Sequence, residues 1–189
     1  MLRQSCLLCD TVQLATHDSV LILNSAADLF VQQVVQHESV KMLLLAEDNI
    51  AATKAVERSS SNKKIAFQHT AFHSYILHQQ PATIDVAIMN LLYQPGTAWV
   101  MHGLQIAAYA LRPGGLLYVT GAKERGILST AKRMQALFGN SETLEISKGE
   151  RVVCARKLTK LSPLEAMQDV TVFAASKLDD GTRHLLSAL

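Results

Sequence analysis

The chain has 189 residues, is 49% hydrophobic and 18% charged, and carries a formal net charge of +2. This composition suffices for one sizeable core and excludes a disordered protein, while the charge alone does not indicate a nucleic-acid binder. The apolar runs are only strand-sized, Asp10 comes too early for a secretory signal, and three cysteines cannot all pair. We therefore expect no membrane span, no disulfide framework and a cytoplasmic protein.

Short apolar runs alternate with stretches of helical periodicity along residues 20–157. A Pro-Gly-Gly turn at residues 112–115 is expected to end one helix before the next strand begins. The predicted strands are Val20–Leu23, Met42–Ala46, Ile65–Phe67, Ile84–Met89, Leu116–Val119, Leu144–Ile146 and Val152–Ala155. The predicted helices are Ala27–Gln36, Asn49–Arg58, Thr70–Gln79, Thr97–Leu111 and Lys123–Phe138.

Continuous apolar strands separated by helices indicate a parallel sheet that is covered on both faces. The last two predicted strands flank Ser147-Lys-Gly-Glu150, which is typical of an antiparallel hairpin. We therefore expect a doubly wound α/β fold with a seven-stranded, mostly parallel sheet and an antiparallel strand at its edge. Ligands of such sheets bind outside the carboxyl ends of the strands, at the switch point. The loops that matter most are those after Leu23, Ala46, Thr70 and Met89.

Two segments resemble S-adenosylmethionine (SAM)-dependent methyltransferases of class I. They are Asn90-Leu-Leu-Tyr93, after the fourth predicted strand, and Leu111-Arg-Pro-Gly-Gly-Leu-Leu-Tyr-Val119. With the strand order and the hairpin end Arg151–Arg156, they are most similar to the small-domain family of ribosomal RNA guanine-N2 methyltransferases, over residues 20–157. The resemblance implies a Rossmann-like fold, methyl transfer from SAM to an exocyclic guanine nitrogen, and ribosomal RNA as partner.

The C-terminal segment Val172–Leu186 resembles the stretch that opens the catalytic domain in that family. Some members carry two copies of the fold, of which the first is degenerate and the second catalytic. We therefore expect residues 1–157 to form a degenerate N-terminal copy. Residues 158–189 are expected to be a linker and the start of a second, catalytic domain, with one short helix that begins at the capping box of residues 162–165 and another over 182–189.

The resemblance places the cofactor at the ends of the first two strands. Family members hold SAM on an acidic-x-Gly-x-Gly loop, but the stretch Asn24–Asp28 has neither the glycines nor the leading carboxylate. Glu47 stands where the family binds the SAM ribose with a carboxylate; alternatively it is a solvated acid at a strand end. The cofactor candidates are Asn24, Glu47 and Asn90, and the departures predict that SAM is bound by the parent protein and not by this domain.

The catalytic motif that the resemblance implies is Asn-Pro-Pro-Phe/Tyr, whose polar groups accept hydrogen bonds from the target amino group and whose aromatic ring stacks on the base. Here Asn90 and Tyr93 remain, while leucines replace both prolines. We interpret the motif as vestigial. Alternatively, Asn90 simply caps a turn and Tyr93 covers the top of the sheet.

Positive charge is concentrated between residues 116 and 160, where nine Lys and Arg outnumber four acids and give +5. If these cations cluster, they contact RNA phosphates without reading sequence; otherwise they form a solvated helix face and hairpin. The candidate RNA contacts are Lys123, Arg125, Lys132, Arg133, Lys148 and Arg151.

No metal site is expected. Cys6 and Cys9 have CxxC spacing but lack two further zinc ligands, and they are better interpreted as two apolar thiols one helical turn apart. His69, His73 and His78 lack an accompanying Cys or carboxylate cluster.

The leading hypothesis is therefore a non-catalytic methyltransferase-like domain that binds substrate RNA or braces a second domain of the same polypeptide. One alternative is a stand-alone active methyltransferase that acts on an RNA amino group, with Glu47 at the ribose, Asn90 at the target nitrogen and Tyr93 as the stacking ring. Another is a structural module that forms a homodimer, its cleft filled by side chains such as Leu91, Leu92 and Phe72.

Overall fold

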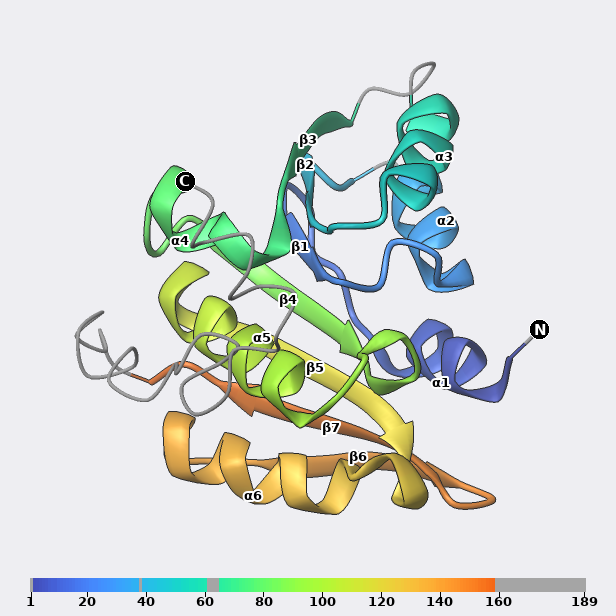
Figure 1. Cartoon of the computed structure of the whole chain (residues 1–189), viewed down its shortest axis with the longest axis vertical. Coiled ribbons are helices and arrows are strands. Elements are labelled where there is room, and N and C mark those ends of the chain that lie inside the picture. The colour runs from blue at the N-terminus through green and yellow to red at the C-terminus, as the bar shows by residue number, and fades with distance from the viewer. Residues whose placement is uncertain (1, 38, 61–64, 159–189) are drawn as a thin grey trace, which may run out of the picture.

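A single seven-stranded sheet forms the centre of the molecule in this computed structural model, which describes residues 2–37, 39–60 and 65–158 (Figure 1). The strand order is β3-β2-β1-β4-β5-β7-β6, and the pairs that link β1 to β5 are parallel. The strands are β1 (Ser19–Leu23), β2 (Met42–Ala46), β3 (Ala66–Thr70), β4 (Ile84–Asn90), β5 (Leu111–Ala122), β6 (Glu142–Ser147) and β7 (Glu150–Arg156). The expected doubly wound α/β fold is thus confirmed.

Helices cover both faces of this sheet (Figure 1). The first three pack on one face and the last three on the other, as the two separate core clusters show. The α-helices are α1 (Arg3–Thr11), α2 (Leu29–Gln36), α3 (Ile50–Ser60), α4 (Tyr75–His78), α5 (Thr97–Ala110) and α6 (Ile127–Phe138). Short 3₁₀ turns are η1 (Phe72–Ser74), η2 (Leu91–Tyr93) and η3 (Lys123–Arg125).

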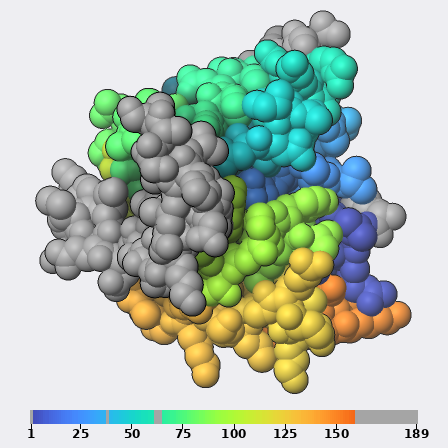
Figure 2. Space-filling view, viewed as in Figure 1, coloured from blue at the N-terminus to red at the C-terminus, as the bar shows by residue number. Residues whose placement is uncertain are grey.

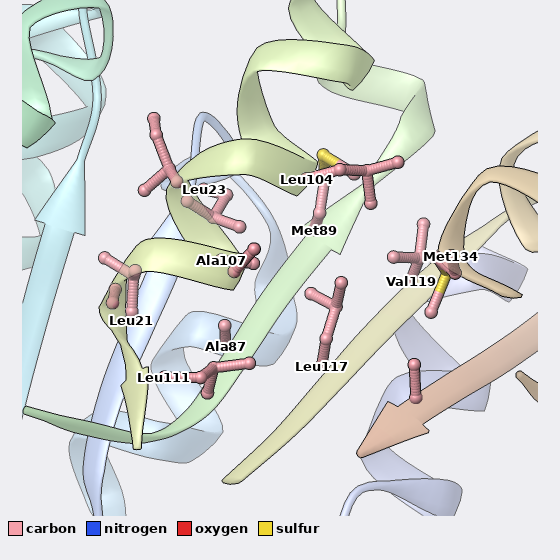
Figure 3. Packing of buried hydrophobic residues seen from close by; sticks show 14 of the residues in the cluster. Leu21, Leu23, Ala87, Met89, Leu104, Ala107, Leu111, Leu117, Val119 and Met134 are labelled. Atoms are coloured by element: carbon pink, nitrogen blue, oxygen red, sulfur yellow. The ribbon is translucent and has the colours of Figure 1, made fainter. Parts of the chain in front are cut away.

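Alternation along the strands divides the core between the two faces. In β1, Leu21 and Leu23 point to the α5 side, whereas Val20 and Ile22 belong to the cluster under α2. Figure 3 shows the α5 and α6 side, where leucines and small residues of β1, β4 and β5 meet these helices. Gly103 lets α5 lie close to β4, because a Cβ there would come within 2.8 Å of the Met89 sulfur.

Four local predictions are wrong. Residues 112–115 are not a turn but part of β5, which pairs with Ile84, shifts register and continues beside Val86. The helix expected from Lys123 is interrupted at Gly126, whose φ of 83° starts α6 one residue later. The antiparallel strand is not at the edge, since β7 inserts between β5 and β6. The helix expected over 70–79 is confined to η1 and α4.

One helix precedes the first strand of the sheet. Helix α1 packs mainly on β7 and α2, and it carries Cys6 and Cys9 one turn apart. Among the described helices, none is both long and apolar enough to cross a membrane. The helix predicted to begin at residues 162–165, the one predicted over 182–189, and almost all of the predicted linker and domain start lie outside the described residues.

Candidate functional site

The strand order reverses between β1 and β4, and three loops meet at the carboxyl ends of the strands there. These are residues 24–28 after β1, residues 47–49 after β2, and η2 with Gln94 after β4. The backbone N–H of Asn24 donates to the carbonyl of Ala46 at 2.8 Å and joins the first two loops. Asn24 has a φ of 43°, a left-handed conformation that asparagine tolerates better than most side chains. The structure therefore brings the predicted cofactor residues together.

Glu47 connects the loop after β1 to the loop after β2 by hydrogen bonds. One carboxylate oxygen accepts the N–H of Ala26 at 3.0 Å and the other accepts the N–H of Asn49 at 2.8 Å. The residue is only 4% exposed, so the interpretation as a solvated acid is wrong. Its charge is held by backbone amides of the protein itself.

Asn90 and Asp28 form a closed polar pair beneath the loops. The Asn90 amide donates to the Asp28 carboxylate at 2.5 Å, and its carbonyl oxygen accepts the N–H of Leu92 at 2.9 Å. The other Asp28 oxygen caps α2 by accepting the N–H of Phe30 at 2.8 Å. Both ends of the Asn90 side chain therefore have protein partners, and the side chain is fully buried.

The side chain of Gln94 lies among the strand ends at the switch point, and no sequence motif indicated this residue. Its amide nitrogen lies 3.3 Å from the carbonyl of Leu23, 3.2 Å from that of Asn24 and 3.1 Å from that of Asn90. Its side-chain oxygen faces the amide of Asn24 at 3.5 Å. The only sequence signal is a polar residue directly after the segment Asn90–Tyr93, which any surface turn would also show.

Tyr93 covers the rim, as the alternative interpretation expected. Its hydroxyl donates to the carbonyl of Ala27 at 3.4 Å. Burial, and then the charge of Asp28, raise the pKa of this phenol, so it stays protonated at neutral pH. Leu91 and Phe72, expected as cleft fillers, instead lie buried in the core cluster on the α5 side.

A pocket of about 240 Å³ remains at the surface beside these residues. Small-molecule sites usually enclose about 300–1,000 Å³, so this pocket is small for a nucleoside cofactor. Trp99 in its wall stacks on Phe72, with ring centroids 5.3 Å apart and planes 3° from parallel. The residues that line the pocket are Asn24, Ser25, Ala27, Glu47, Asn49, Tyr93, Pro95 and Trp99.

The six predicted RNA contacts lie on η3, α6 and the β6–β7 hairpin. The hairpin tip adjoins η3, because the N–H of Lys123 donates to the carbonyl of Gly149 at 3.3 Å. Arg125 and Arg133 line a second pocket, which lies between the beginnings of α5 and α6. The other four candidates are Lys123, Lys132, Lys148 and Arg151, none of which lines that pocket.

Within the described residues, no group of three or more His, Cys, Asp or Glu is arranged to hold a metal ion. His69 and His73 have other partners, since His69 lies 2.8 Å from the Glu47 carbonyl and His73 pairs with Asp48 at 3.1 Å. Burial raises the pKa of the Cys154 thiol to about 11, which leaves it protonated and inert.

Known proteins resemble this chain in sequence and in fold. No protein-family model matches the chain. Ribosomal RNA small subunit methyltransferase C of Shewanella loihica is 26% identical over 196 residues, which cover 94% of this chain and 54% of that protein. The chain thus spans about half the length of the curated relative to which it is homologous.

Solved structures agree on the fold. A T. thermophilus 16S rRNA N2 G1207 methyltransferase (RsmC), in complex with AdoMet and guanosine, matches with a TM-score of 0.67 and 24% identity over 97% of this chain and 51% of that chain. A SAM-dependent O-methyltransferase from Thermotoga maritima matches with a TM-score of 0.63 and 11% identity, over 85% of this chain and 66% of the other. The fold is that of class I methyltransferases.

Proposed function

We propose that this chain is the non-catalytic, methyltransferase-like N-terminal half of a SAM-dependent ribosomal RNA guanine-N2 methyltransferase. It binds substrate RNA and supports a second half that holds SAM and transfers the methyl group. The observation that carries the proposal is the closed pair of Asn90 and Asp28 at the position of the family's catalytic motif.

A catalytic Asn at this position must offer its carbonyl oxygen to the target amino group. Here that oxygen accepts the Leu92 N–H, and the amide is committed to Asp28. If Asn90 turned toward a substrate, the Asp28 carboxylate would lose the Asn90 amide as its hydrogen-bond donor, although Asp28 is only 3% exposed. An unsatisfied buried charge costs more than the roughly 1–3 kcal/mol of a neutral polar group. The Asn90 side chain is therefore more stable with its internal partners than turned toward a substrate.

The residues at the switch point do not fit SAM either. Glu47, the ribose candidate, already accepts one backbone N–H on each oxygen. Ala26 and Asp28 stand where the resemblance expects glycines, and Asp28 fills its position with a charged side chain. The amide of Gln94 is bonded to the strand-end carbonyls that border the pocket. We therefore assign no chemical step to this half.

The RNA role is supported by the distribution of cations. Lys123, Arg125, Lys132 and Lys148 are exposed, and they lie on segments that adjoin one another around η3. A cluster of this kind attracts phosphates regardless of base sequence, and its binding weakens steeply with salt.

Two titrations of the 189-residue chain test the proposal. In calorimetry with SAM we expect no heat at millimolar ligand, and in fluorescence anisotropy we expect salt-dependent binding of a labelled RNA oligonucleotide. SAM binding at micromolar Kd that is lost on Glu47→Ala would overturn the non-catalytic assignment. Exposed Glu142→Gln is the matched control for that variant. Failure of the wild type to bind RNA would remove the RNA role.

A further inference from the structure

We propose that the groove between the beginnings of α5 and α6 binds a backbone phosphate of RNA through Arg125 and Arg133. This inference rests on the proposed RNA role and adds to it a defined site. Helices α5 and α6 lie on the same face of the sheet and both begin at the end where β4 and β5 finish (Figure 1). Their surfaces adjoin in the space-filling view (Figure 2).

The groove is a polar cavity of about 330 Å³, which is ample for a phosphate group. Both arginines line it, together with Gln94, Thr97 and Ser129. Glu124 is also at its wall, so two cations face one carboxylate there. The groove is separate from the pocket beside Glu47, with which it shares only Pro95.

Neither arginine forms an ion pair with a carboxylate in the described part of the chain. Arg125 donates to the carbonyl of Leu92 over 3.5 Å, a long contact that a phosphate oxygen readily replaces. Arg133 is half-buried at the wall of the groove. A guanidinium presents paired N–H donors that match two phosphate oxygens, so this residue type suits the ligand.

The helices supply further donors to the same groove. Gly96 and Gly126 stand at the N-caps of α5 and α6, and neither helix has a side-chain cap or an acid in its first turn. The first intrahelical bonds of α5 begin with the N–H of Trp99, which leaves the two preceding amides of that turn for a ligand. Two helix N-termini then add partial positive charge beside the two arginines.

The chemistry favours an RNA backbone over a small free anion because the positive charge continues past the groove. Lys123 is the first residue of η3, two positions before Arg125. The hairpin tip, which carries Lys148, is joined to η3 by the hydrogen bond from the N–H of Lys123 to the carbonyl of Gly149. A strand whose one phosphate sits between Arg125 and Arg133 thus finds further cations at neighbouring positions. These contacts read no sequence.

The test compares two charge-matched double variants of the 189-residue chain. Arg125→Gln/Arg133→Gln removes the groove cations, and Lys41→Gln/Lys54→Gln removes two exposed cations outside it. Binding of a fluorescein-labelled, single-stranded RNA of mixed sequence is measured by anisotropy between about 50 and 200 mM salt. We expect about a tenfold loss of affinity for the groove variant. The slope of log K against log salt falls by about 0.7, the share of one phosphate on a single strand.

A second measurement locates the contact. In NMR titrations with inorganic phosphate, the amides of Thr97, Ala98 and Leu128 should shift in the wild type and not in the groove variant. Equal affinities of the groove variant and the wild type for RNA overturn the groove and leave the RNA role standing. Equal losses in both double variants overturn it too, since net charge alone then explains binding. If the wild type binds no RNA, the proposed RNA role fails. The assignment of an RNA phosphate to the groove then fails as well, even if inorganic phosphate shifts these amides.

Discussion

Replacing Asn90 by alanine separates a structural residue from a catalytic one. The side chain makes one charge-assisted hydrogen bond to Asp28 and one to the Leu92 N–H. The first contributes about 1.5–3 kcal/mol and the second about 1 kcal/mol, so Asn90→Ala should lower the free energy of unfolding by about 3 kcal/mol. For a chain of this length that corresponds to a Tm roughly 6–12 °C lower.

The assay is urea unfolding followed by far-ultraviolet circular dichroism, with calorimetry for the Tm. Asn49→Ala is the matched control, because Asn49 is exposed and its side chain accepts one N–H, that of Ala52, at the start of α3. It should lose only about 1 kcal/mol. The isosteric Asn90→Asp removes the donor and sets a second carboxylate against Asp28, so it should be more destabilising at neutral pH than in acid.

An Asn90→Ala variant as stable as the wild type, or more stable, would refute the reasoning. Residues held ready for a substrate are often stability liabilities, and their removal then leaves stability unchanged or increases it. A destabilised variant has the opposite meaning, namely that the protein itself is the partner of Asn90.

Three further predictions concern polar groups that are buried or half-buried. Glu47→Gln should cost about 1–3 kcal/mol in urea unfolding, because its amide cannot accept the second of two backbone N–H groups. Lys157→Met should lower the urea midpoint by the equivalent of about 2 kcal/mol, since the ammonium donates to two carbonyls at the end of α5. Burial lowers the pKa of His102 below 6.5, so the unfolded state takes up the proton first and stability falls as pH drops below that value. The Tm difference between pH 7 and pH 5 should therefore shrink in His102→Gln.

The sheet was predictable because its central strands are continuous apolar runs. Met42–Ala46 has the bounds predicted from the sequence, and β4 differs by one residue. The prediction was wrong where glycine and proline signals have more than one outcome. Residues 112–115 continue β5 through a register shift with Gly114 at a φ of 86°, whereas the same residues suit a turn. Local chemistry does not distinguish the two, because the pairing of β5 with β4 decides it.

The candidate site was only half predictable. The resemblance identified Asn24, Glu47 and Asn90, and the structure brings them to one switch point. The resemblance did not indicate in which direction the polar groups of these side chains point. Asp28 caps α2 and is at the same time the partner of Asn90, 62 positions along the chain. Such a pairing depends on the register of β1 against β4, which no local pattern encodes.

The geometry of the switch point explains what these residues would do in the proposed non-catalytic half. Where parallel strands end and their loops diverge, backbone carbonyls and amides are left without neighbours in the sheet. A bound cofactor would satisfy some of these groups. Here the two N–H groups of the Gln94 amide are shared among the carbonyls of Leu23, Asn24 and Asn90, and Glu47 accepts the amides of both flanking loops. Polar side chains of the protein thus take the bonds that a ligand would make. The backbone groups at this edge of the sheet are thereby satisfied from within the chain.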